Sequence, residues 1–353
     1  MNNLFDKITT YYHQKLPFVV YSKPNSEKVS AFFMPDTELN FVSNFEEKGF
    51  VFAPFSSSEK VILFPEEKAL SVSESVQPES YNLQDIVFNA DISSKEKHIK
   101  IVESAIEKIH KSDLQKVVIS REELVDITNF DLIKIYRKLL SAYKNAFVYV
   151  WFHPEVGLWF GATPETLLSI SGTTFKTMSL AGTQVCTENE KVVWKSKELE
   201  EQQLVTNFIE SQLENIAANL EIDKTETVKA GNLLHLRTKV SGNLKETSSL
   251  EELIRGLHPT PAVCGLPREI ASAFIFEKES YNRSFYTGFL GELNMPHSKK
   301  DRKSSALFVN LRCMRIENNR AAVFVGGGIT KDSNAAKEWE ETVSKSKTMK
   351  RVL

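Results

Sequence analysis

The chain changes repeatedly between two hydrophobic periods, and this limits the folds that it can adopt. Short apolar runs bounded by polar turns are typical of strands, and the longest such run covers residues 146–152. Between these runs, Ile99, Val102 and Ile106 recur at the spacing of a helix. Helices interleaved with many strands predict an α+β fold, a single large domain of antiparallel sheets with helices packed outside.

The expected elements follow from these periods. The first 65 residues are rich in strand-like runs, whereas the serine-rich segment 71–80 predicts a surface loop or a linker. A long helix should follow, with Ser93 or Ser94 as its N-cap. The other expected elements are a strand at 116–120, helices over 131–143 and 197–218, strands near 146–152, 157–161 and 166–170, strands in "SALFVNLRCMRI" and "AAVFVGGGI", and a C-terminal helix.

Composition argues against several classes of protein. The 353 residues carry a net charge of −2, whereas proteins that bind nucleic acid or an anionic membrane usually need a basic face. The longest apolar run is too short to cross a bilayer, and the N-terminal stretch does not resemble a signal peptide. The three cysteines are far apart and odd in number, which predicts reduced thiols and a cytoplasmic protein.

The stretch "HPTPAVCGLPR", residues 258–268, is too rich in proline to form a helix or an interior strand. It therefore predicts a rigid irregular loop. Such a loop is either a connector or the wall of a ligand pocket, where fixed backbone presents shape and a few polar groups.

Two predicted helices carry carboxylates at regular spacing. Glu198 and Glu201 continue the apolar face that begins at Val205, which directs both toward the interior. Glu338 and Glu341 form a similar stripe that ends at Lys345. A solvated helical face is the alternative for each pair. If the carboxylates converge, they suit Mg²⁺, which takes one or two protein carboxylates and leaves positions for water and an anionic substrate.

Other motifs carry weaker signals. The glycines at 326–328 end a predicted strand and would let a ligand approach the backbone, although a tight turn is the simpler explanation. No dinucleotide fingerprint or P-loop is present, and no histidine pair has the spacing of a zinc site. A nucleophilic pair of Cys264 and His258 lacks a third member.

Two residues are candidates for proton transfer. Lys116 stands at the start of an apolar strand, where enclosure beside a divalent cation would favour the neutral amine and make it a general base. Glu165 lies in a tight turn before another strand, where partial burial would keep the carboxyl protonated as a general acid. A lysine that extends to water and a surface glutamate are the alternatives.

Taken together, these stretches resemble the chorismate-utilising enzymes. The resemblance covers about residue 94 to the C-terminus, so 94–353 is the expected chorismate-binding catalytic region. Residues 1–90 match no motif and are expected to form a strand-rich segment of the same domain. The ordered matching segments are "QKVVISR", "FGATPETLL", "SLAGT", "KELEEQQLV", "LLHL", "HPTPAVCGLPR", "YNRSFYTGFLGEL", "FVNLRC" and "VGGGITKDSNAAKEWEETVSK".

The resemblance implies a role for each matching residue. Glu201 and Glu341 would be the Mg²⁺ ligands, with Glu198 and Glu338 nearby. Lys116 would activate water to attack C2 of chorismate, and Glu165 would protonate the C4 hydroxyl as it leaves. The expected substrate-binding residues are Gly182, Thr183, His235, Ala262, Tyr286, Arg312, Gly327 and Lys345.

Within the family, the isochorismate synthase branch is the most similar. Lys116 favours water over ammonia, so no glutaminase subunit is expected. Ala181 stands where aminodeoxychorismate synthases carry a nucleophilic lysine, and Ala262 stands where aminating and salicylate-forming relatives commonly carry threonine. Such an enzyme would feed menaquinone or siderophore synthesis. The alternatives are a salicylate synthase, an aminating synthase and an inactive chorismate-binding relative.

The chain departs from the family's motifs at two places. Gln202 follows Glu201 where relatives usually carry histidine, which could alter the surroundings of the metal. Ser179 replaces a common alanine in "SLAGT".

Overall fold

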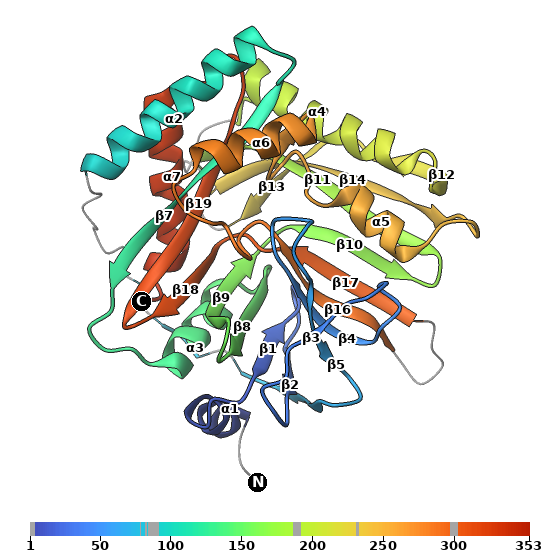
Figure 1. Ribbon diagram of the computed structural model, residues 1–353, viewed down its shortest axis with the longest axis vertical. Helices are drawn as coiled ribbons and strands as arrows, with labels where there is room; N and C mark the ends of the chain where they lie inside the picture. Colours follow the sequence, from blue (N-terminus) through green and yellow to red (C-terminus); the bar gives the residue numbers. More distant parts are fainter. Residues whose placement is uncertain are drawn as a thin grey trace.

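Two large antiparallel sheets form the centre of the molecule (Figure 1). The computed structural model describes residues 4–77, 79–81, 83, 92–185, 192–230, 233–296 and 303–353. This part of the chain contains helices α1 to α7 and strands β1 to β19. The predicted α+β class, with antiparallel sheets and helices packed outside, is confirmed.

The first sheet has nine strands, and it contains strands from both the N-terminal and the C-terminal parts of the chain. Its centre pairs β18 with β9, and β7 lies antiparallel to β19 over ten registered residue pairs. In spatial order its strands are β15 (Gly265–Leu266), β7 (Lys116–Asp126), β19 (Arg320–Ile329), β18 (Cys313–Glu317), β9 (Gly157–Thr163), β8 (Phe147–His153), β1 (Phe18–Ser22), β2 (Lys28–Phe33) and β6 (Leu70–Ser75).

The second sheet has ten strands. Strand β13 (Glu226–Ala230) pairs with β14 beside the main order. The other strands, in spatial order, are β12 (Ala217–Ile222), β14 (Leu233–Leu244), β11 (Thr174–Val185), β10 (Thr166–Ser171), β17 (Lys303–Val309), β16 (Phe289–Pro296), β4 (Gly49–Ala53), β5 (Ile62–Pro65) and β3 (Asn40–Phe41).

An aromatic core joins the two sheets. Alternate residues of β8 point to opposite faces, so Phe147, Tyr149 and Trp151 pack into this core. Phe52 of the second sheet lies in the same cluster and stacks on Phe285 with ring centroids 4.2 Å apart. The sheets are therefore held face to face by large apolar side chains, each of which adds about 1.5–3 kcal/mol when fully buried.

Helices cover the outer faces of both sheets (Figure 1). Helices α2 (Ile92–Lys111) and α7 (Ala335–Lys350) pack together over β7 and β19, and α6 (Arg268–Lys278) also contacts β7. Helix α4 (Ser196–Leu213) lies on β11 and contacts α5 (Leu250–Leu257). Helices α1 (Leu4–His13) and α3 (Leu132–Ala142) contact each other at the opposite end of the molecule. Among the described helices, none is both long enough and apolar enough to span a membrane.

Three expectations about local structure were wrong. The segment 71–80 is not wholly loop, because its first half continues β6, whose exposed serines tolerate an edge position beside β2. Ser93 and Ser94 lie inside the first turn of α2, which begins at Ile92. Helix α4 ends at Leu213 rather than at residue 218, because Ala217 pairs with Leu244 of β14.

The N-terminal segment contributes to both sheets. Strand β1 pairs with β8 in the first sheet, and β4 pairs with β16 in the second. Its strands therefore extend the same two sheets that hold the matched region.

Candidate active site

A cavity of ≈ 70 Å³ lies where the two sheets meet α4 and α7. Carboxylates, cations and backbone from both sheets converge on it. Its lining residues include Val118 of β7, Glu165, Leu180 to Thr183 of β11, Glu201, His235, Ala262, Val263, Tyr286, Thr287, Arg312, Gly326 to Gly328 of β19, Glu341 and Lys345. The cavity is therefore lined by eleven of the residues expected at the site from sequence, and by Val263 of the proline-rich loop.

The glycines of β19 allow two helices to approach the strand. A Cβ at Gly328 would lie 2.3 Å from Glu201 Oε1 and 2.9 Å from Lys116 Cε, so a side chain there would clash. At Gly327 a Cβ would lie 3.5 Å from Glu338 Oε2 and 3.7 Å from Glu341 Oε1. These glycines therefore bring strand backbone against the carboxylates of α4 and α7.

Each of three carboxylates is paired with a lysine. Lys116 Nζ lies 2.9 Å from Glu201 Oε1, and the Lys116 side chain is fully buried. Lys345 Nζ lies 2.6 Å from Glu341 Oε1. The third pair, Lys197 Nζ with Glu338 Oε1, is separated by 2.5 Å. Sequence reasoning missed Lys197, which lies one residue before Glu198 on α4.

The two acids of α7 have opposite pKa shifts. Burial, and then the nearby charge of Glu341, raise the pKa of Glu338. Burial also pushes the pKa of Glu341 upward, but Lys345, Lys197 and Arg312 together outweigh it and the net pKa is lowered. Two neighbouring carboxylates that repel each other form a site of negative charge that a cation would relieve.

The carboxylates fit a divalent cation of the magnesium type. Glu201 and Glu341 line the same cavity and come from different helices. Within the described residues, no group of three acidic, histidine or cysteine side chains is arranged to hold a metal on its own. Mg²⁺ needs only one or two protein carboxylates, because water and an anionic substrate complete its shell.

Glu198 has a different position from Glu201. Its Oε2 accepts a hydrogen bond from the Lys195 backbone N–H over 3.0 Å, which caps the N-terminus of α4. Glu198 is not among the residues that line the cavity, although its Cβ lies near Gly182. Of the two acids expected to extend the buried face of this helix, Glu201 therefore enters the site and Glu198 stabilises the helix end.

Glu165 is buried where β9 connects to β10. It is 3% exposed and lines the cavity. Burial raises its pKa to about 8, against the opposing positive charges of Lys116, Arg312 and Lys345. The side chain therefore holds a proton at neutral pH, which is the state that a general acid needs.

His235 offers an acceptor to the cavity. Its Nδ1 lies 3.0 Å from the Gly182 carbonyl oxygen, so Nδ1 carries the proton and donates it. Burial, and then the charges of Arg312 and Lys345, lower its pKa to about 3, so the ring is neutral. Its buried Nε2 has no hydrogen-bond partner among the residues that the structure describes, and it can accept a hydrogen bond from a hydroxyl group.

Arg312 and Gly182 adopt left-handed backbone conformations at the cavity. Arg312 has φ +46° in the connection between β17 and β18, which ends one sheet and begins the other. Gly182 has φ +68° at a bulge in β11, between Ala181 and Thr183. Both bends place their residues among those that line the cavity. The opposing wall includes the buried Tyr286, whose pKa is raised by burial.

The proline-rich loop contributes part of the cavity wall. Ala262 and Val263 line the cavity, and Gly265 and Leu266 pair with β7 as a two-residue edge strand. The loop is thus fixed at one end by backbone hydrogen bonds and carries small apolar side chains into the site.

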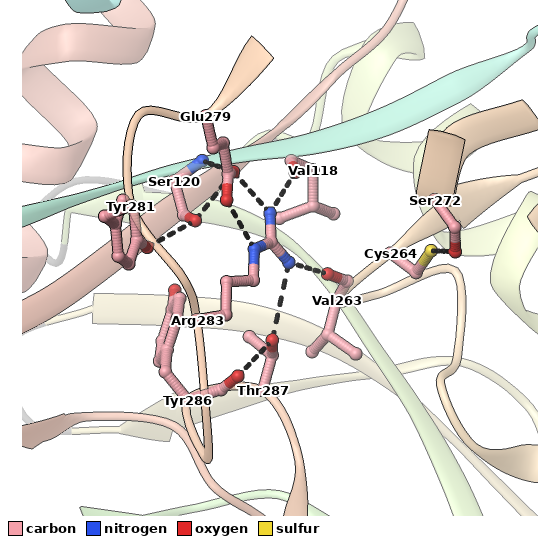
Figure 2. Close-up of polar contacts among 10 residues, drawn as sticks. All are labelled: Val118, Ser120, Val263, Cys264, Ser272, Glu279, Tyr281, Arg283, Tyr286 and Thr287. Atoms are coloured by element: carbon pink, nitrogen blue, oxygen red, sulfur yellow. Dashed lines mark hydrogen bonds and ion pairs between the residues drawn. The ribbon is translucent and has the colours of Figure 1, made fainter. Parts of the chain in front are cut away.

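A buried arginine holds this wall in place (Figure 2). Arg283 forms an ion pair with Glu279 over 2.6 Å, and both side chains are 2% exposed. The guanidinium also donates to the carbonyl oxygens of Val118 and Val263, at 2.7 and 2.9 Å. Arg283 therefore ties β7 to the proline-rich loop beside the cavity. Sequence reasoning assigned it no role.

Gln202 joins α4 to β11 beneath the cavity. Its Oε1 accepts from the Ala181 N–H at 2.9 Å. Its Nε2 donates to Ser179 Oγ at 2.8 Å and to Thr238 Oγ1 at 3.0 Å. Gln202 is 2% exposed and therefore fixes the register of the helix that carries Glu201.

Comparison of the sequence with models of known protein families shows which family the chain belongs to. A family model described as "Chorismate binding enzyme" matches residues 51–353. The chain belongs to the chorismate-binding enzyme family. The match begins within β4, so it includes N-terminal strands as well as all the site residues named above.

Curated relatives within this family include isochorismate synthases. The chain is 29% identical to isochorismate synthase MenF of Bacillus subtilis over 278 residues, which is 75% of this chain and 57% of that protein. It is 30% identical to the vibriobactin-specific isochorismate synthase of Vibrio cholerae over 267 residues, 72% of this chain and 66% of that protein. The matched region thus spans between half and two thirds of these relatives.

Solved structures share the fold. MenF of Escherichia coli, a menaquinone-specific isochorismate synthase, superimposes with a TM-score of 0.77 at 19% identity, covering 96% of this chain and 88% of that one. DhbC from Bacillus anthracis gives a TM-score of 0.81 at 24% identity, covering 99% of both chains. Anthranilate synthase component I from Streptococcus pneumoniae gives 0.68 at 20%, covering 94% and 89%.

Proposed function

We propose that this protein is an isochorismate synthase, which converts chorismate to isochorismate by adding water at C2 and releasing the C4 hydroxyl. The observation that carries the proposal is the buried Glu165, whose pKa is raised to about 8 in a cavity that also contains cations. A protonated carboxyl in such a cavity can donate to a leaving hydroxyl group, whereas an ordinary surface glutamate would be ionised.

Lys116 takes the complementary role. It removes a proton from the attacking water, while Glu165 donates a proton to the departing hydroxyl, which leaves as water. The product is therefore an isomer of the substrate, and proton exchange with solvent restores both side chains. Each such proton transfer contributes roughly 10²–10⁴-fold to the rate.

The remaining residues hold the substrate. Arg312 and Lys345 provide positive charge for the carboxylates of chorismate. His235 Nε2 accepts from a hydroxyl group of the substrate or from the attacking water. Glu201 and Glu341 would hold Mg²⁺, which when bound supplies fixed positive charge beside a substrate carboxylate.

Ala181 and Ala262 support water as the nucleophile. Both line the cavity with small apolar side chains, and no lysine occupies the position of Ala181. A covalent intermediate of the kind expected in aminodeoxychorismate synthases therefore has no nucleophile at this position.

Chromatography of the products tests the proposal. Purified protein is incubated with chorismate and Mg²⁺, with and without ammonium. Isochorismate alone is the expected product. Salicylate with pyruvate, an aminated product that requires ammonium, or no conversion would each refute the proposed activity. Lys116→Gln is expected to lower kcat by about 10²–10⁴-fold with the fold unchanged by circular dichroism.

A further inference from the structure

A second cavity, of ≈ 320 Å³, adjoins the catalytic cavity. It lies between the α3–β8 connection, strand β13 and the C-terminal half of α7. It shares Pro164 and Arg312 with the catalytic cavity. We call this second cavity the antechamber. Because Arg312 lines both spaces, it stands at their boundary.

All the charged residues that line the antechamber are basic. They are Lys144, Lys229, Arg312, Lys347 and Arg351, and none of the lining residues is an aspartate or glutamate. Lys144, Lys229 and Lys347 are exposed, and they form no ion pair within the part of the chain that the structure describes. The whole chain has a net charge of −2, so this concentration of positive charge is local.

Helix α7 connects the two cavities. Glu341, Lys345 and Thr348 follow at i, i+4 and i+7, so they lie on one stripe of the helix. The first two line the catalytic cavity, and Thr348 lines the antechamber. The same helix therefore presents paired charges at the catalytic cavity and unpaired positive charge at the antechamber.

Arg312 faces groups on both sides of the boundary. Its charge interacts with Glu341 and Glu165 of the catalytic cavity and with Tyr143 of the antechamber. The guanidinium is therefore within reach of an anion in either space.

We propose that the antechamber is the entry site for a small dicarboxylate anion, which is attracted by Lys144, Lys229 and Lys347 and delivered to the catalytic cavity at Arg312. The identity of that anion as chorismate rests on the proposed function. Cations that line a concave surface concentrate the electric field, and such steering raises association rates by roughly 10–10³-fold in a manner that salt weakens.

Charge reversal at the antechamber tests this proposal. The variants are Lys144→Glu, Lys347→Glu and the double variant, neither position belonging to the catalytic site. Lys100→Glu is the matched control, because Lys100 is an exposed lysine of α2 that lines neither cavity. The measured quantities are kcat and kcat/KM for chorismate at ionic strengths of about 0.01 and 0.15 M, between which the screening length falls from about 30 to 8 Å.

The double variant is expected to lose about tenfold in kcat/KM at low ionic strength, with kcat unchanged and with a weaker salt dependence than the wild type. The control should match the wild type. An unchanged kcat/KM with an unchanged salt dependence would overturn the proposal, as would a loss confined to kcat.

The test of the entry site can be interpreted even if the proposed activity is wrong. If the wild type makes another product from chorismate, the proposed function fails, but the same variants still test entry of the anion. If the wild type does not turn over, the association rate of chorismate, followed by stopped-flow tryptophan fluorescence, replaces kcat/KM. Failure to bind chorismate at all would overturn both proposals.

Discussion

Gln202 Nε2 donates a hydrogen bond to Ser179 Oγ over 2.8 Å, so the two positions that the sequence singles out as expected departures from the family's motifs are in direct contact. Both side chains are buried. Ser179 Oγ also lies 2.8 Å from Thr206 Oγ1 of α4. The serine therefore provides a partner that an alanine could not offer to the glutamine amide, and the two departures are explained together.

Removing this glutamine should loosen α4. Gln202→Ala leaves the Ala181 N–H without its acceptor and removes one of the two hydrogen bonds of the Ser179 hydroxyl, so we expect a loss of about 1–3 kcal/mol in the free energy of unfolding. Urea denaturation of this variant, of Ser179→Ala and of the double variant measures the coupling. A coupling energy of at least about 0.5 kcal/mol is expected, and simple additivity would contradict the shared role.

Glu165 should make stability depend on pH. Its pKa is about 8 in the folded protein and near 4.5 when unfolded, so the protonated form favours folding. This contribution is complete below about pH 4.5 and is lost as the pH rises through 8, up to about 5 kcal/mol. Urea unfolding at several pH values from 5 to 9 checks it. Relative to Glu165→Gln, the wild type should lose stability as the pH rises, and parallel curves would refute the shift.

Three buried histidines should make the stability of the protein depend on pH at the acid end of the range. Burial lowers the pKa of His98 and His258 to about 4 and that of His235 to about 3. Their neutral forms favour folding, so stability is complete above about pH 6.5 and falls as the pH drops toward 4. His98→Gln leaves the catalytic cavity unchanged and should flatten the acid side of the stability curve. Identical acid limbs for this variant and the wild type would exclude His98 as a contributor.

Glu341 should determine the dependence on magnesium. Glu341→Gln keeps the size of the side chain but removes a charge that lines the cavity, so the Mg²⁺ concentration for half-maximal activity should rise about tenfold or more. Glu340→Gln is the control, because Glu340 is the exposed neighbour on the same helix. Equal Mg²⁺ titrations for both variants would remove Glu341 from the proposed metal site.

Replacing only one partner of the buried ion pair between Arg283 and Glu279 should lower the stability of the protein strongly. Arg283→Met leaves a buried Glu279 carboxylate without its main partner, which costs about 3–5 kcal/mol. Adding Glu279→Gln should recover part of that loss, because the uncompensated charge disappears. Thermal unfolding of the two single variants and the double variant checks this, and a double variant no more stable than Arg283→Met alone would contradict it.

Helical spacing was sufficient to predict part of the site. Glu201 and Glu341 could be placed because each extends the inward stripe of its own helix. Lys116 and Glu165 could be named as candidates because each borders an apolar strand, but their burial follows from the fold. The helical spacing and the strand borders are local properties, and a single stretch of sequence contains them.

The remaining features depend on pairing between distant segments. Lys197 meets Glu338 across 141 residues, and Arg283 reaches the Val118 carbonyl across 165. Nothing in the sequence near either residue indicates its partner. The end of α4 was misplaced for the same reason, because Ile216 continues the helical spacing although the next residue pairs with β14. Tertiary pairing overrides local preference at such points.

The strand order has a consequence for how the protein is made. Strand β7 has β19 as its long partner, and β4 is bordered by β16, so neither sheet can be completed until nearly the whole chain has left the ribosome. Pairings of such long sequence separation form slowly and leave apolar edges uncovered in the meantime. The nascent chain should therefore need protection from aggregation for most of its synthesis.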